Sequence, residues 1–178
     1  MNVVAIVGEQ CEVLPFPDQE AIRNLPKLIE AIRAKLPVDR IITQAYEGGH
    51  PDHDATALAV SIAVAGTSTP VFEYPSYHAF QAPMVASVFL PHPSNPVVEH
   101  CVLNPMDVAR KLGMFDCFLS QRQVLERFPL TEEQFRSAPA YDFLEPPHPG
   151  PLYYESRDMG ITYSEWRELA RAALVHYK

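Results

Sequence analysis

The stretch Tyr46-Glu-Gly-Gly-His-Pro-Asp-His-Asp-Ala-Thr56 follows a short apolar run and opens an apolar, helix-forming segment. Its two glycines allow the backbone to turn sharply and to approach a ligand closely. Pro51 suits the first position of a helix, where its missing N–H would have had no intrahelical partner. His50 then caps the helix, and His53, three residues on, faces the same way. The sequence therefore predicts a strand, a tight turn and a helix that presents two imidazoles together.

Working outward, strand-like and helix-like segments alternate along the chain. A buried parallel strand is expected at Arg40–Gln44, before the turn, because this short run contains β-branched residues. Further strands are expected at 3–7, 11–14, 71–74, 85–90 and 97–103, and helices at 22–36, 52–65, 106–125, after Thr131-x-x-Gln134 and after Thr162-x-x-Glu165. This order predicts an α/β fold, Rossmann-like and layered, with a largely parallel sheet flanked by helices. Ligands of such sheets bind at the carboxyl ends of the strands, where His50–Asp54 would lie.

Composition narrows the class of protein. The length of 178 residues fits one domain over 1–178, and 47% hydrophobic residues describe an ordinary globular chain. A net charge of −8 argues against nucleic acid or an anionic membrane as the main partner. Without an apolar run long enough to span a membrane or a basic signal peptide, we expect a cytoplasmic protein. The three cysteines have no metal-site spacing and are expected to be reduced core thiols.

The segment Gly49-His-Pro-Asp-His53 resembles the second signature of the PIG-L/LmbE-type N-deacetylases. The resemblance extends to Lys27–Pro37 and Asp39–Thr43 before it, and to the helical segment from Lys111 to Ser120-Gln121 after it. It is strongest over residues 13–65. Members of this family are zinc enzymes that remove acetyl groups from N-acetylated amino sugars and related glycoconjugates. The resemblance therefore implies zinc as cofactor and a small amino-sugar conjugate as substrate.

The same resemblance implies a role for each residue of the cluster. His53 matches a metal ligand, and a helix would hold it rigidly. His50 matches the residue that stabilises the oxyanion and protonates the leaving amine. Asp52 matches the carboxylate that holds the other nitrogen of His50. Asp54 is either an accessory ligand or, more simply, an acidic residue matched to the dipole at the helix start.

The family also carries an earlier motif, Ala-His-Pro-Asp-Asp-Glu, which supplies two metal ligands and the general base. Nothing in this chain matches it. The nearest string, Pro15-Phe-Pro-Asp-Gln-Glu20, has Phe16 and Gln19 at the ligand positions, and we interpret it as the turn before a helix. We therefore expect a family member that lacks its first strand–helix segment, with zinc bound weakly.

Two further groups of residues are candidates for the site. Glu47 either reaches the substrate or acts as a surrogate base, and the alternative is a solvated loop acid. His148 stands in the stiff loop Glu145-Pro-Pro-His-Pro-Gly150, where it either lines the mouth of the site or belongs to a plain turn. A sugar-stacking wall could be built from aromatic residues that would otherwise be core, namely Tyr74, Tyr77, Phe80, Tyr153 and Tyr154.

Two functions of different class follow from these observations. The first is a zinc-dependent N-deacetylase whose remaining half-site is absent here or comes from another chain. The second is a non-catalytic deacetylase-like domain that binds a glycoconjugate or a protein partner. A nucleotide-sugar enzyme is a weaker third, because the chain has no Gly-rich phosphate loop. The sequence leaves the oligomeric state open.

Overall fold

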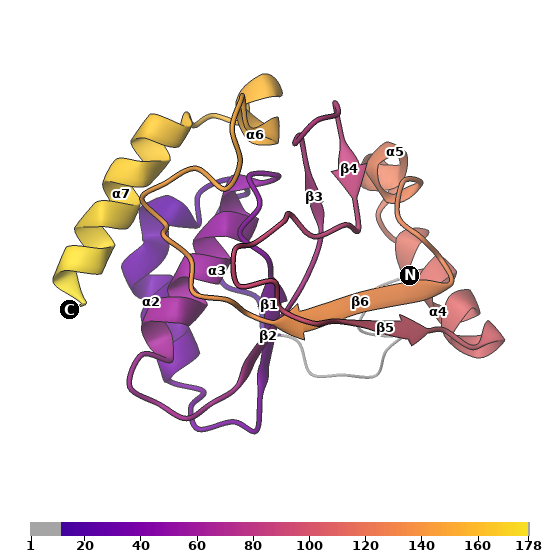
Figure 1. Ribbon diagram of the computed structural model, residues 1–178, viewed down its shortest axis with the longest axis horizontal. Coiled ribbons are helices and arrows are strands. Elements are labelled where there is room, and N and C mark those ends of the chain that lie inside the picture. Colours follow the sequence, from indigo (N-terminus) through magenta and orange to yellow (C-terminus); the bar gives the residue numbers. More distant parts are fainter. Residues whose placement is uncertain (1–11, 178) are drawn as a thin grey trace.

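The computed structural model describes residues 12–177 and shows a four-stranded sheet with helices packed against it (Figure 1). The strands are β1 Ile41–Gln44, β2 Val71–Tyr74, β3 Tyr77–His78, β4 Val85–Ala86, β5 Val98–Val102 and β6 Glu132–Ser137. The helices are η1 Ile22–Asn24, α2 Leu25–Arg33, α3 Pro51–Ala63, α4 Pro105–Phe115, η2 Leu119–Gln121, α5 Arg122–Leu125, α6 Tyr153–Ser156 and α7 Tyr163–His176. The predicted α/β class is confirmed.

The main sheet has the strand order β1-β2-β6-β5 and is mixed. Only β1 and β2 are parallel, with Ile41 opposite Val71, whereas β6 runs antiparallel to both β2 and β5. The prediction of a largely parallel sheet is therefore wrong. One reason for the error is the pattern Thr131-x-x-Gln134, which predicts the start of a helix. Residues 132–137 instead form strand β6. Continuous pairing of β6 with β5 outweighs this local capping pattern.

The core lies between the β1 end of the sheet and three helices, α2, α3 and α7 (Figure 1). Helix α3 is apolar almost all round, which is typical of a helix buried on several sides. Its buried side chains include Ala55, Leu58 and Ile62. Trp166 of α7 is fully buried, and its Nε1 donates to the Pro51 carbonyl at 3.3 Å. The first turn of α3, which carries the two histidines, is thereby fastened to the rigid core.

Several local predictions are confirmed, and others change in extent. Helix α2 begins at Leu25 with Pro26 in its first turn, and Thr162 and Glu165 form the expected capping box of α7. The predicted helix 106–125 is divided into α4, η2 and α5, and the predicted strand 85–90 shrinks to β4. The strand expected at 3–7 lies outside the described residues, and residues 12–14 form no strand. Cys101 is exposed, so it is a free thiol but not a core one.

The far end of the molecule is less tightly packed. Strands β5 and β6 extend away from the three core helices, and α4 and α5 lie beyond their ends (Figure 1). No residue of α4 is buried. No helix within residues 12–177 is long and apolar enough to cross a membrane.

Candidate active site

The turn between β1 and α3 brings the backbone into close contact with the loop that follows β2. Gly48 has φ +73°, a backbone conformation that residues other than glycine rarely adopt. A Cβ atom on Gly49 would lie 1.8 Å from the carbonyl oxygen of Tyr77, so no other residue fits there without movement of the backbone. The cluster therefore follows the carboxyl end of β1, beside the corresponding end of the parallel strand β2, as predicted.

Two buried carboxyl groups fix this turn. The Glu47 Oε1 atom accepts hydrogen bonds from the backbone N–H groups of Ser76 at 2.6 Å and Tyr77 at 2.8 Å. The Asp54 Oδ1 atom accepts from the N–H groups of Glu47 and Gly48 at 3.1 and 3.2 Å. Burial raises the pKa of Asp54 to about 7 and the pKa of Glu47 well above its usual range. These acids hold the loops after β1 and β2 together.

This geometry fits neither expected role of Glu47, as a solvated loop acid or as a residue that reaches the substrate. Its side chain is 1% exposed, so the interpretation as a solvated loop acid is wrong. Glu47 also does not line the cleft in front of the histidines, and it acts on them only through the backbone that it positions.

The two imidazoles of the cluster lie next to each other, as the sequence predicts. The ring centroids of His50 and His53 are 5.1 Å apart. His50 caps α3, and its Nδ1 atom accepts a hydrogen bond from the Asp52 N–H at 3.2 Å. Because Nδ1 needs its lone pair for this bond, the proton of the neutral ring resides on Nε2. His50 therefore presents an N–H donor at Nε2.

His53 is more deeply enclosed than His50. Burial, with a smaller contribution from His50, lowers the pKa of His53 to about 3. The ring is therefore uncharged and keeps a nitrogen lone pair at neutral pH, which is the form that binds metal ions. Its Nδ1 atom is buried and has no hydrogen-bond partner among residues 12–177. The ring of Tyr77 lies edge-on to it, with centroids 5.7 Å apart.

The Asp52 carboxylate does not hold His50 as the resemblance implies. Asp52 accepts hydrogen bonds from the N–H groups of Gln19 at 2.8 Å and Ala21 at 2.9 Å, and so ties the preceding loop to α3. Gln19 has φ +70°, an unfavourable conformation for glutamine that these bonds hold in place. The carboxylate that faces His50 Nε2 is instead that of Asp18, at 3.7 Å. Sequence reasoning treated residues 15–20 as a turn, which is correct, but missed that this turn reaches the site.

An open cleft of about 380 Å³ lies in front of these residues. One end is polar, with Asp18, His50, Asp52 and His53. The remaining wall is formed by Tyr77, Phe118, Gln121, Val124, Leu125 and Phe128. Of the aromatic residues proposed as a stacking wall, Tyr77 lines the cleft, and Tyr153 supports it from behind with ring centroids 5.1 Å apart.

His148 lies outside this cleft. It is 4% exposed, and its Nδ1 is 2.9 Å from the carbonyl oxygen of Pro149. Its ring centroid is 5.7 Å from that of Phe80 and 6.2 Å from that of His78. Gly48 packs against Pro147 and Leu152 near this loop. His148 is thus part of the packing around the turn and does not line the mouth of the cleft.

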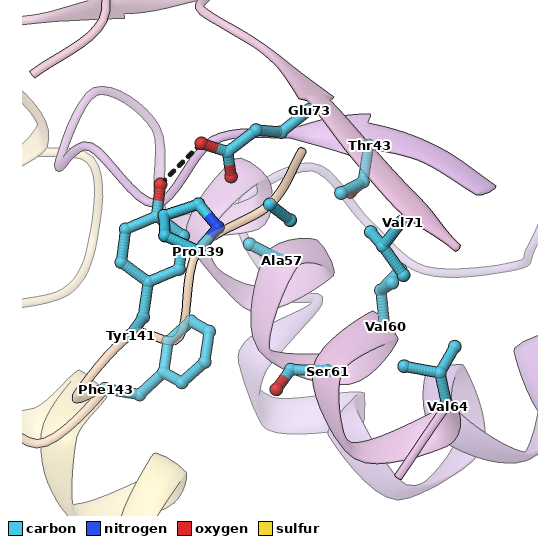
Figure 2. Close-up of a pocket in the computed structure, with 11 residues that line it drawn as sticks. Thr43, Ala57, Val60, Ser61, Val64, Val71, Glu73, Pro139, Tyr141 and Phe143 are labelled. Carbon is cyan, nitrogen blue, oxygen red and sulfur yellow. Dashed lines mark hydrogen bonds between the residues drawn. The ribbon is translucent and has the colours of Figure 1, made fainter. Parts of the chain in front are cut away.

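A second cavity, of about 130 Å³, lies between α3 and the strands β1 and β2, and shares no lining residue with the histidine cleft. Figure 2 shows Glu73 at this cavity, hydrogen-bonded to the hydroxyl of Tyr141. The same carboxylate accepts from Arg136 Nε at 2.6 Å, and both side chains of this ion pair are buried. The Glu73 carboxylate is thus already paired, and no imidazole or thiol is among the described residues that line this cavity.

The donor atoms around His50 are of the types that bind zinc, namely imidazole nitrogen and carboxylate oxygen. Ligand atoms of Asp18, His50 and Asp52 lie within 4.8 Å of one another. However, His50 carries its proton on Nε2, and both Asp52 oxygens already accept backbone hydrogen bonds. Among the described residues, this group does not include His53, which the resemblance implies as the metal ligand, so a site that uses His53 and Asp18 stays a proposal. The residues fit a metal, but fall short of the three ligands of a full catalytic zinc site.

Comparisons of the chain with protein-family models, with curated proteins and with solved structures give no match. The functional argument therefore rests on the geometry of these residues and on the resemblance of the His50–His53 segment.

Proposed function

We propose that the protein is a metal-dependent amide hydrolase, which removes the acetyl group from an N-acetylated amino sugar or glycoconjugate with zinc as cofactor. One observation carries this proposal. A protonated Nε2 of His50 and the uncharged ring of His53 lie side by side at the polar end of one cleft. Metal-assisted hydrolysis of an amide uses a donor for the oxyanion and ligands for the metal, and these two rings offer one of each.

His50 is proposed as the donor to the reacting amide. Its Nε2–H can donate a hydrogen bond to the carbonyl oxygen of the amide, which becomes negatively charged when water adds. The Asp18 carboxylate lies 3.7 Å from this Nε2 atom. Asp52, which the resemblance links to His50, contributes indirectly, because it fixes both the cap of α3 and the loop that carries Asp18.

His53 is proposed as the metal ligand, with Asp18 as a second donor. Helix α3 and the contact with Tyr77 hold the His53 ring, and its low pKa keeps protons from competing with the metal. Zinc, when bound, supplies a Lewis acid that makes water nucleophilic and polarises a carbonyl group. The acidic composition and the small cleft also support a small-molecule substrate over a nucleic acid.

The second candidate, a non-catalytic domain that binds a glycoconjugate or a protein partner, is favoured by a different observation. His53 and Asp18 are fewer ligands than a catalytic zinc requires. A cleft of this size with an aromatic wall could still bind a sugar without hydrolysing it.

One experiment separates the two candidates. The full chain, supplied with zinc, is incubated with N-acetylglucosamine and its glycosides, and released acetate and free amine are quantified. The hydrolase proposal expects both products in equal amounts, with loss of activity on chelation and in His53→Ala. Saturable binding without either product supports the binding domain. Absence of both binding and turnover contradicts both candidates.

A further inference from the structure

We propose that the substrate of the histidine cleft carries an uncharged apolar group next to its acyl amide. This inference rests on the proposed function and specifies the class of substrate. The cleft separates into a small polar end and a larger apolar wall, so that a ligand with one polar and one apolar part matches it best.

The apolar wall comes from the segment around η2 and α5. Phe118, Val124, Leu125 and Phe128 face the cleft, and the Phe128 ring meets Tyr77 with centroids 6.5 Å apart. Gln121 is the one uncharged polar side chain among these wall residues. A sugar alone would leave most of this surface in contact with water, whereas an apolar substituent would cover it.

The apolar surface continues beyond the cleft. A neighbouring cavity of about 330 Å³ shares Leu125 and Phe128 with it and is further lined by Leu112, Phe115 and Leu130. Phe118 at the mouth of the cleft is 47% exposed, although phenylalanine is usually buried. The apolar residues along α5 therefore offer contacts for an alkyl chain and not only for a single methyl group.

Charge argues against an anionic substituent. No Lys or Arg lines the described part of the histidine cleft, whereas two carboxylates, Asp18 and Asp52, do. The one basic side chain in the neighbouring cavity, Arg122, lies there with Asp116 and Glu126. Away from the proposed metal ion, a phosphate or carboxylate substituent would thus find no cationic side chain in the described cleft, which selects for neutral conjugates.

Calorimetric titration of the zinc-supplied full chain tests this proposal with four probes, each below its critical micelle concentration. They are N-acetylglucosamine, its octyl β-glycoside, its 1-phosphate, and glucosamine N-acylated with octanoate. At least one of the two compounds with an eight-carbon chain, called the octyl compounds below, is expected to bind at least about 100-fold more tightly than N-acetylglucosamine, because each buried methylene contributes about fourfold in affinity. The 1-phosphate is expected to bind more weakly than the parent sugar. The octyl compound that gains affinity shows whether the apolar group is the aglycone or the acyl chain.

Matched variants locate the effect. Phe118→Ser, in the wall, is expected to reduce the affinity gain of the octyl compounds at least tenfold. Leu119→Ser is the control, because Leu119 is 73% exposed and lies outside the cleft, and it is expected to leave this gain unchanged. Circular dichroism confirms that both variants are folded. Gln121→Arg is expected to improve binding of the 1-phosphate.

The outcomes distinguish this inference from the proposed function. Equal affinity for the octyl compounds and the parent sugar, together with acetate release from the parent, overturns the apolar group and leaves the hydrolase intact. An octyl gain that both serine variants retain equally also overturns it. An octyl gain that depends on Phe118, without any amide cleavage, supports the apolar subsite and contradicts the hydrolase.

Discussion

The Nε2 atom of His50 lies 3.7 Å from the carboxylate of Asp18, a residue that belongs to a loop far earlier in the chain. This contact exists because Asp52 accepts hydrogen bonds from the backbone of that loop, at Gln19 and Ala21. The same Asp52 donates its own N–H to His50 Nδ1. One aspartate thus sets the tautomer of His50 and places its charged neighbour.

Asp52→Asn is expected to destabilise the protein by about 1–3 kcal/mol, because an amide keeps one acceptor oxygen and turns its NH₂ toward a backbone donor. Urea unfolding of the wild type and the variant measures the difference. Asp39→Asn, at an exposed position, is the control and is expected to change the free energy of unfolding by less than about 0.5 kcal/mol. Equal stability of the two variants would show that Asp52 does not hold the loop.

Asp54 gives the protein a specific pH dependence. Its pKa is raised from 3.8 to about 7 in the folded state, mainly by burial. Between these values the folded state binds a proton that the unfolded state has released, so the free energy of unfolding should fall as pH rises from about 4 to 7. Glu47, whose pKa is also raised by burial, changes the stability in the same direction.

Asp54→Asn removes the ionisation, while its carbonyl oxygen can still accept from the Glu47 and Gly48 N–H groups. We therefore expect the free energy of unfolding of the variant, relative to that of the wild type, to be higher at pH 8 than at pH 5. Denaturant unfolding at the two pH values measures this. If the difference between the two proteins is the same at both, the Asp54 carboxyl does not titrate in this range.

Gly49→Ala is expected to destabilise the fold by at least about 3 kcal/mol, since its Cβ would overlap the Tyr77 carbonyl oxygen. Gly66→Ala is a suitable control, because no atom lies within 4 Å of a Cβ there and only its φ of +79° opposes substitution. That control should cost about 1 kcal/mol. Thermal unfolding compares the two variants, and similar losses would contradict the close approach at Gly49.

The turn and helix around His50 could be predicted from the sequence because their causes are local. Gly48 and Gly49 permit the turn, Pro51 starts the helix, and spacing alone places His50 and His53 on one side. Strand β6 could not be predicted in this way. Residues 132–137 have no regular alternation of apolar residues and become a strand only through pairing with β5 and β2.

The position of Asp18 was also outside local reasoning. The string around it indicates a turn, but its approach to His50 depends on hydrogen bonds that the Asp52 carboxylate accepts from Gln19 and Ala21, more than thirty positions away. The burial of Glu47 likewise depends on distant residues, because its carboxylate accepts hydrogen bonds from the N–H groups of Ser76 and Tyr77. The sequence does not distinguish a buried carboxylate from a solvated one when its hydrogen-bond donors are backbone N–H groups far away in the chain.

The central claim is that His53 holds the metal while the Nε2–H of His50 donates a hydrogen bond to the reacting amide. Zinc titration of the wild type, His53→Ala and His50→Ala, read together with acetate release from an N-acetylglucosamine conjugate, tests it most directly. We expect His53→Ala to lose zinc affinity and turnover together. His50→Ala should bind zinc nearly as the wild type does while kcat falls roughly 10²–10³-fold, the usual loss for one oxyanion donor. Loss of zinc in His50→Ala, with retention in His53→Ala, would contradict this division of roles.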